Sequence, residues 1–250
     1  MALQKSGTLG RVTYTDQSEY EVRFETGEQG LHALAVGGVS HFVIVDVLSF
    51  STCVDVATER GAQIIPYFWK DSRAESYARE RQALLAGGPG STYALTVESL
   101  SRIPPGTRLV LPSPNGSALS FGAAQYARVL AGCLRNRAAI SAYLNGLSGP
   151  IAVIAAGERW GSDGSLRACL EDTLGAGAIL AGLGGTRSPE AEGAVAVFEA
   201  FRHRLRETLV RCSSGRELGE KGHPRNIEMA AEIDASTGVP LMQDGGFTRA

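Results

Sequence analysis

Apolar residues gather in short runs along this chain, and four of the runs end in a polar, glycine-containing turn. The first run, 42–48, contains Asp46, and the runs at 109–111, 129–132 and 151–155 are each followed by a comparable turn. Short β-branched runs of this kind are typical of strands buried on both faces of a parallel sheet. Helical spacing follows each turn, so the pattern predicts a repeated unit of strand, turn and helix.

This alternation predicts an α/β fold class, a three-layer α/β/α arrangement with a mostly parallel central sheet. We expect a single domain, 1–250, because no linker or shift in composition divides the chain. An irregular excursion rich in glycine and proline lies at 87–107. A connection of that length is more often functional than a short one.

The same periodicities predict the remaining elements, with glycine pairs ending several of the helices. These elements are an edge strand or hairpin at 11–24, a strand at 63–68, and helices at 31–36, 72–85, 166–183, 189–209 and 217–234, the last interrupted at 222–224. None of them forms a repeat of fixed period.

Composition and charge exclude several classes of protein. The chain has 250 residues, 44% hydrophobic and 20% charged, which is ordinary for a globular protein. Its net charge of −2 argues against nucleic-acid binding, which needs a basic face. No apolar run reaches membrane-spanning length and no signal peptide is recognisable, so we expect a cytoplasmic protein without a membrane partner. The protein partner we expect is a second copy of the chain, in a homodimer.

Asp46 is the most informative single residue. A carboxylate at the end of an apolar strand is costly unless it is hydrogen-bonded, paired or bound to a metal ion, and parallel sheets bind ligands outside the carboxyl ends of their strands. The alternative is that Asp46 caps the following helix. An aspartyl-phosphate mechanism is disfavoured, because Leu48 stands where a second Asp is needed.

The second and third turns carry groups suited to an anion. The 113–117 turn, Ser-Pro-Asn-Gly-Ser, predicts converging backbone N–H groups that bind phosphate or sulfonate, although it is not a Walker A loop. The third turn supplies Arg135, Asn136 and Arg137. Arginine grips carboxylates, sulfonates and phosphates through paired hydrogen bonds, and we expect at most one of the two arginines to face the site.

Acidic residues lie within the fourth turn and in the helix predicted after it. Glu158 and Arg159 lie in it, and Glu171 and Asp172 lie in the next predicted helix. Inward-facing acids near Asp46 would form an oxygen ligand set suited to Mg²⁺. In the alternative, Glu158 pairs with Arg159 on the surface and the two later acids are solvated.

The cysteines are scattered and form no C-x-x-C pair, so we expect reduced, buried thiols. Cys133 lies in the third turn, where a nucleophilic role is the alternative, but no nearby histidine would activate it. The four histidines have no metal-ligand partner at helical spacing.

Taken together, the turns resemble the ComB family, the 2-phosphosulfolactate phosphatases. The matching segments, in the family's order, are Asp46-Val47-Leu48-Ser49-Phe50-Ser51-Thr52, Asn115-Gly116-Ser117, Gly132 to Asn136, and Ala156-Gly157 followed by Glu171-Asp172. Four turns in order are far more specific than one. Ser49 replaces an arginine of the family pattern, and the family's acidic loop has no counterpart between Gly87 and Thr107.

The resemblance implies a ComB-like fold and a Mg²⁺-dependent phosphoric monoester hydrolase of sulfolactate or coenzyme M chemistry. Its substrate would be 2-phosphosulfolactate, giving sulfolactate and phosphate, or a related small phosphorylated acid. The expected catalytic and metal-binding residues are Asp46, Glu171 and Asp172. The residues expected to bind substrate are Ser51, Ser113, Asn115, Gly116, Ser117, Arg135, Asn136, Gly157, Glu158 and Arg159. The alternative is a non-catalytic or divergent member of the same fold that binds a small anion.

Overall fold

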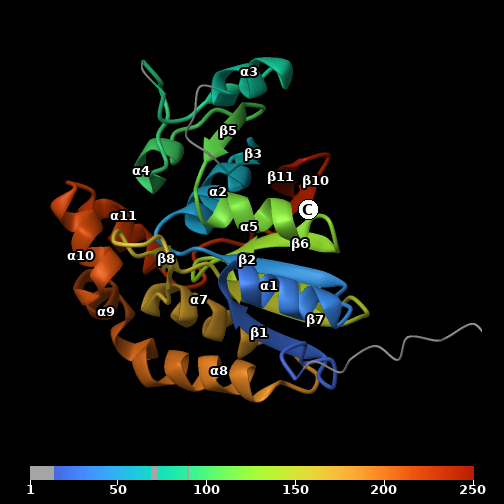
Figure 1. Ribbon diagram of the computed structural model, residues 1–250. Coiled ribbons are helices and arrows are strands. Elements are labelled where there is room, and N and C mark those ends of the chain that lie inside the picture. The colour runs from blue at the N-terminus through green and yellow to red at the C-terminus, as the bar shows by residue number, and fades with distance from the viewer. Residues whose placement is uncertain (1–13, 69–72, 89) are drawn as a thin grey trace, which may run out of the picture.

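A computed structural model describes residues 14–68, 73–88 and 90–250, and a nine-stranded sheet runs through this part of the chain (Figure 1). The strand order is β1-β7-β2-β6-β10-β11-β3-β5-β4. The strands are β1 (Val22–Thr26), β2 (His41–Val45), β3 (Gln63–Tyr67), β4 (Leu84–Leu85), β5 (Arg108–Pro112), β6 (Arg128–Gly132), β7 (Ile151–Ala155), β10 (Pro240–Gln243) and β11 (Gly246–Arg249). Parallel pairs outnumber antiparallel ones, as predicted.

Helices cover both faces of the sheet. They are α1 (Gly27–Val36), α2 (Phe50–Glu59), α3 (Arg73–Glu80), α4 (Val97–Leu100), α5 (Gly116–Ala123), α6 (Arg137–Asn145), α7 (Leu170–Leu180), α8 (Pro189–Phe201), α9 (Leu205–Arg211), α10 (Ser213–Glu220) and α11 (Pro224–Ala230). Within the described ranges, none of these helices has both the length and the apolar character needed to cross a membrane.

Strand β2 shows why the arrangement has three layers. Phe42 and Ile44 point into a core shared with α1, α2 and α5, whereas Val43 and Val45 point into a second core shared with α6, α7 and α8. Because alternate side chains of a strand face opposite sides, a continuous apolar run buries both faces of the sheet. The predicted three-layer α/β/α fold is confirmed.

A hairpin of β10 and β11 joins two sets of parallel strands, β1-β7-β2-β6 and β3-β5-β4. Leu241 pairs with Leu130 of β6, and Phe247 pairs with Ile64 of β3. All three pairings along this connection are antiparallel, and Figure 1 shows β5 at a steep angle to β2. The hairpin therefore sets how the two parts of the sheet meet.

Several predicted bounds are wrong where a local interaction overrides the pattern. Of the predicted strand at 11–24, residues 11–13 lie outside the described part, residues 14–20 form turns, and β1 begins only at Val22. The predicted helix at 166–183 begins at Leu170, because residues 166–167 pair with 158–159 in a small separate sheet. Pairing between residues 158–159 and 166–167 holds the start of the predicted helix as a strand, and helical periodicity does not detect such pairing.

Two other helices are shorter than predicted. The predicted helix at 72–85 is described from Arg73 and ends at Glu80. Leu84 and Leu85, at the end of the predicted range, form β4 instead, because they pair with β5. The helix at 189–209 is divided by a 3₁₀ turn, Arg202–Arg204, which redirects α9 so that Leu205 and Leu209 reach the core. The excursion itself contains α4.

Replacing Phe247 tests the role of the hairpin. The side chain is fully buried and lies edge-to-face on Phe50, with the ring centroids 6.2 Å apart. Phe247→Ala should lower the free energy of unfolding by about 3–5 kcal/mol, through lost burial and the cavity left behind. Chemical denaturation measures it, and Val36→Ala, at a site 76% exposed, is the control. A loss below about 1 kcal/mol would show that the hairpin is only loosely attached.

Candidate active site at the strand ends

Asp46 lies directly after β2 and joins two segments that are distant in sequence. Its Oδ1 atom accepts a hydrogen bond from the N–H of Phe50 at 3.0 Å, and its Oδ2 atom accepts one from the N–H of Gly116 at 3.0 Å. The first contact satisfies a donor at the start of α2, and the second reaches the start of α5. Asp46 therefore bonds the start of one helix, as the capping alternative expects, and also meets the 113–117 turn. Its role in binding a ligand or metal ion stays a prediction.

Gly116 allows this close approach because it has no side chain. A Cβ atom there would lie 2.2 Å from Cδ1 of Phe50 and 2.8 Å from Oδ2 of Asp46. Both distances are far below van der Waals contact. The requirement for glycine comes from space, and it fixes the distance between Asp46 and the first turn of α5.

Asp172 holds the other side of the site together. Its Oδ1 atom accepts a hydrogen bond from the N–H of Val47 at 2.8 Å, and its Oδ2 atom accepts one from the N–H of Gly157 at 2.8 Å. Asp172 and Glu171 form the buried first turn of α7. The expectation that these acids face inward is therefore met, and the solvated alternative is wrong.

Burial and mutual repulsion dominate the electrostatics of these acids. Burial raises the pKa of Asp46 to about 6, the N–H groups of Phe50 and Gly116 oppose the rise, and the charges of Glu158 and Glu171 add to it. Burial, followed by the charges of Asp46 and Glu171, raises the pKa of Asp172 well above its usual value. The acids from β2, the fourth turn and α7 are thus close enough to disfavour one another's ionisation.

The fourth turn is a hairpin rather than a simple turn. β8 (Glu158–Arg159) pairs with β9 (Leu166–Arg167), and Nδ2 of Asn115 donates a hydrogen bond to Oε1 of Glu158 at 2.9 Å. Glu158 therefore contacts the 113–117 turn, and of Arg159 it bonds the backbone N–H, so the alternative of a surface ion pair between the two side chains is wrong. Beside this contact lies a cavity of about 540 Å³, lined in part by Asn115, Arg159 and Leu166.

Several other predicted substrate-binding side chains are buried and bonded to backbone. The Ser51 hydroxyl donates to the carbonyl of Ile44, and the Ser117 hydroxyl donates to the carbonyl of Leu111. The Asn136 side chain accepts from the N–H of Cys133 and donates to the carbonyl of Ala131. Ser113 is also buried. These groups hold strand ends in place, and their contact with substrate stays a prediction.

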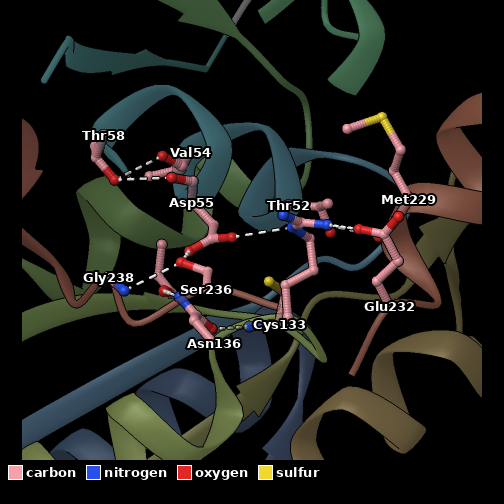
Figure 2. Close-up of polar contacts among 12 residues, drawn as sticks. Thr52, Val54, Asp55, Thr58, Cys133, Asn136, Met229, Glu232, Ser236 and Gly238 are labelled. Atoms are coloured by element: carbon pink, nitrogen blue, oxygen red, sulfur yellow. Dashed lines mark hydrogen bonds and ion pairs between the residues drawn. The ribbon is translucent and has the colours of Figure 1, made fainter. Parts of the chain in front are cut away.

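Arg135 is engaged by acids other than Asp46, Glu171 and Asp172. Its Nε atom lies 3.3 Å from Oδ2 of Asp55, and its Nη1 atom contacts the carboxylate of Glu232 and the carbonyl of Met229. Figure 2 shows Asp55, Glu232 and Ser236 in this network. The guanidinium is thus held by groups of its own fold, whereas Arg159 lies on the cavity.

Asp55 is a buried acid that periodicity alone did not single out. Ser236 donates its hydroxyl hydrogen to Oδ1 of Asp55 at 2.8 Å, and the N–H of Gly238 donates to Oγ of Ser236 at 3.0 Å. The network fixes the segment leading into β10 against α2 (Figure 2). The available signal was an acid among buried apolar neighbours on α2, where charge is costly without partners.

Cys133 is unsuited to act as a nucleophile. Its thiol is fully buried, and burial raises the pKa of Cys133, so the reactive thiolate is disfavoured. This finding removes the physical basis for the alternative of a cysteine enzyme.

The fold and site define an α/β protein in which acids, backbone amides and a cavity converge at the ends of buried strands. A family model described as 2-phosphosulpholactate phosphatase matches residues 29–245. A protein named 2-phosphosulfolactate phosphatase from Methanothermobacter thermautotrophicus is 28% identical over 210 residues, covering 81% of this chain and 87% of that one. A protein named probable 2-phosphosulfolactate phosphatase from Gloeobacter violaceus is 27% identical over 220 residues, with 82% and 89% covered.

The chain belongs to the 2-phosphosulfolactate phosphatase family, since the family model covers most of its length. The resemblance found in the four turns is thereby confirmed. The family and the names of these relatives place the chain among the phosphoric monoester hydrolases.

The contact between Gly116 and Asp46 can be tested by adding one carbon. Gly116→Ala should lower phosphatase turnover at least about 10-fold, because the new Cβ forces Phe50 and the carboxylate of Asp46 apart and small displacements cost catalysis heavily. Steady-state kinetics measure the effect, and Gly193→Ala, on open surface of α8, is the matched control. Equal turnover in the two variants would contradict the assignment.

Asp55 should make stability depend on pH. Burial raises its pKa to about 6, whereas the Ser236 hydroxyl and the Arg135 guanidinium lower it and the charge of Glu59 adds to the rise. The folded state then holds the proton more tightly than the unfolded state. The stabilisation is present below about pH 4 and is lost as pH rises toward 6, by about 3 kcal/mol.

Asp55→Asn removes this titration. The stability difference between wild type and variant should therefore shift by about 2–3 kcal/mol against wild type between pH 4 and pH 7. Denaturant unfolding across that range measures the difference, in which contributions from other buried acids cancel. Parallel stability curves for the two proteins would refute a raised pKa at Asp55.

Proposed function

We propose that the protein is a Mg²⁺-dependent phosphatase of a small anionic phosphomonoester, with 2-phosphosulfolactate as the first candidate substrate. The relatives named for that substrate support this choice. The observation that carries the proposal is the contact of Asp46 with Gly116, because it joins the acids to the first turn of α5.

The donor chemistry fits Mg²⁺. Asp46, Glu171 and Asp172 supply hard carboxylate oxygens, and their mutual repulsion in a buried setting would be relieved by a divalent cation. Among the residues that the structure describes, no group of three or more His, Cys, Asp or Glu side chains is arranged to hold a metal ion. Mg²⁺ commonly takes one or two carboxylates and keeps several waters, so Asp46 and Glu171 would be sufficient.

Asp172 is the weaker candidate for direct contact with the cation. Each oxygen of Asp46 and of Asp172 accepts one backbone N–H hydrogen bond, but those to Asp172 are the shorter, at 2.8 Å against 3.0 Å. Its role would be to hold the loop after β2 and the turn after β7 at the distance that the acids need. When bound, Mg²⁺ would supply polarisation of the phosphoryl group and an activated water.

The start of α5 would bind the phosphoryl oxygens. The first N–H groups of a helix lack helical acceptors and lie at the positive end of its dipole. Pro114, Asn115 and Ala118 line the cavity, so this turn faces the space in which a ligand would lie. The chain's own contribution would be to orient the phosphoryl group and to stabilise negative charge as it builds on its oxygens.

The rival proposal is a non-catalytic protein that binds the same anion. The motivating observation is Ser49, buried at the start of α2 where the family pattern has a cation. A protein that binds 2-phosphosulfolactate in calorimetry but releases no phosphate with Mg²⁺ or Mn²⁺ would favour this rival.

Asp46→Asn tests the proposed function. Phosphate release from 2-phosphosulfolactate should fall at least about 100-fold, because the substitution removes the negative charge while keeping the side-chain shape. Asp244→Asn, in the exposed turn between β10 and β11, is the matched control. Circular dichroism checks that the fold is kept. Full activity in a folded Asp46→Asn variant would refute the assignment.

A further inference from the structure

The β8–β9 hairpin presents different side chains on its two faces. Glu158 stands opposite Arg167, and Arg159 stands opposite Leu166. Residues directly opposite in an antiparallel pair project to the same face, and their neighbours along the strand project to the other. One face therefore carries Glu158 and Arg167, and the other carries Arg159 and Leu166.

The face that carries Arg159 and Leu166 is the one on the cavity beside α1. The Leu166 side chain packs so closely on Gly27 and Gly157 that a Cβ on either glycine would lie 2.8 Å from a Leu166 methyl. Leu166 and Arg159 both line the 540 Å³ cavity beside α1. Glu25 and Glu28 line the same cavity, and Arg159 is the one cation among its described lining residues, so an anion beyond the phosphoryl group is disfavoured on this side.

Arg167 lies on the other face of the hairpin, together with Glu158. Glu158 on this face contacts Asn115 and is among the charges that raise the pKa of Asp46. The backbone of Arg167 also lies close to Gly157, because a Cβ atom on Gly157 would be only 2.9 Å from the carbonyl oxygen of Arg167. The N–H of Gly157 in turn donates to Asp172. The Arg167 backbone thus lies against the turn that Asp172 holds, and the charges of Arg167, Glu171 and Asp172 all act on the thiol of Cys169, although the sequence position of Arg167 gave no such indication.

The Arg167 guanidinium is ordered by neutral groups. Its Nη2 atom donates to the hydroxyl of Ser214 at 3.2 Å, and its central carbon lies 5.8 Å from the centre of the Trp160 ring. No carboxylate within the described part of the chain lies within 4.0 Å of its nitrogens. It is therefore a positioned cation whose charge is not neutralised by a direct ion pair.

A hollow of about 590 Å³ opens beside this cation. It is lined by Glu158, Arg159, Trp160, Gly161, Arg167, Ser213, Glu217 and Lys221. Three of these residues are cations and two are acids. Lys221 already pairs with Glu217 at 2.6 Å, and Arg159 donates to the carbonyl of Gly164, which leaves the guanidinium of Arg167 as the better anion-binding group in this hollow.

We infer that Arg167 is a specificity-determining residue, which binds a second acidic group, carboxylate or sulfonate, of the phosphomonoester substrate. The inference rests on the proposed function. It supplies a cation for the substrate's second acid, since Arg135 is engaged elsewhere and Ser49 stands where the family pattern has an arginine. Arg135 is already held by Asp55 and Glu232, and Arg159 projects from the opposite face of the hairpin, where it donates to the carbonyl of Gly164. A planar guanidinium grips either acid through paired hydrogen bonds.

The test compares three phosphomonoesters that lose one acid at a time: 2-phosphosulfolactate, 2-phospholactate and isopropyl phosphate. Arg167→Ala should reduce the preference for an acid-bearing substrate over isopropyl phosphate, as a ratio of kcat/KM, by about 10- to 100-fold, mainly through KM. Arg167→Lys should keep part of the preference. The acid whose removal makes the variant and wild type equal is the one that Arg167 binds.

Calorimetry with sulfolactate, which carries no phosphate, separates this inference from the proposed function. Binding to wild type that weakens at least 10-fold in Arg167→Ala supports the subsite even in a protein that hydrolyses none of the esters. Arg211→Ala, an exposed arginine paired with Glu207, is the control and should leave the ratio unchanged. Active wild type whose substrate preference and sulfolactate binding are the same in Arg167→Ala would overturn the inference and leave the phosphatase assignment standing.

Discussion

The structure of this site depends on backbone N–H groups that hold two buried carboxylates. Asp46 accepts from Phe50 and Gly116, and Asp172 accepts from Val47 and Gly157. A buried charge without such donors would cost several kcal/mol. These four hydrogen bonds tie the ends of β2 and β7 to the starts of α2, α5 and α7, so the geometry of the acids and the geometry of the helices are specified together.

The parts of the fold that follow from local pattern could be predicted from the sequence. The apolar runs of β2, β5, β6 and β7 are buried on both faces. Asp46 contacts the 113–117 turn through Gly116, and the charge of Glu171 raises the pKa of Asp46. The β10–β11 hairpin was not predicted, because its short strands become a sheet only by pairing with β6 and β3. Two-residue strands carry no periodicity of their own, so the sequence predicts a turn at β8 and the start of a helix at β9.

The arginines show the limit of reading a site from sequence. Arg135 follows a strand and precedes a helix, as a ligand-binding residue does, but Asp55 and Glu232 lie 80 and 97 residues away from it and engage its charge. Arg167 stands in no recognisable motif, and only the pairing of β8 with β9 places it beside Glu158. What an arginine binds is decided by the nearest carboxylate in space, and a single sequence does not contain that distance.

The position of β10 and β11 within the sheet also affects the order in which the protein matures. In the described chain these strands are translated after every other strand of the sheet, yet they lie between β6 and β3. While a ribosome is still making residues 240–249, the two flanking strands have no continuous ladder between them. Asp46 and Gly116 therefore sit on parts of the nascent polypeptide that the sheet joins only when this late hairpin docks.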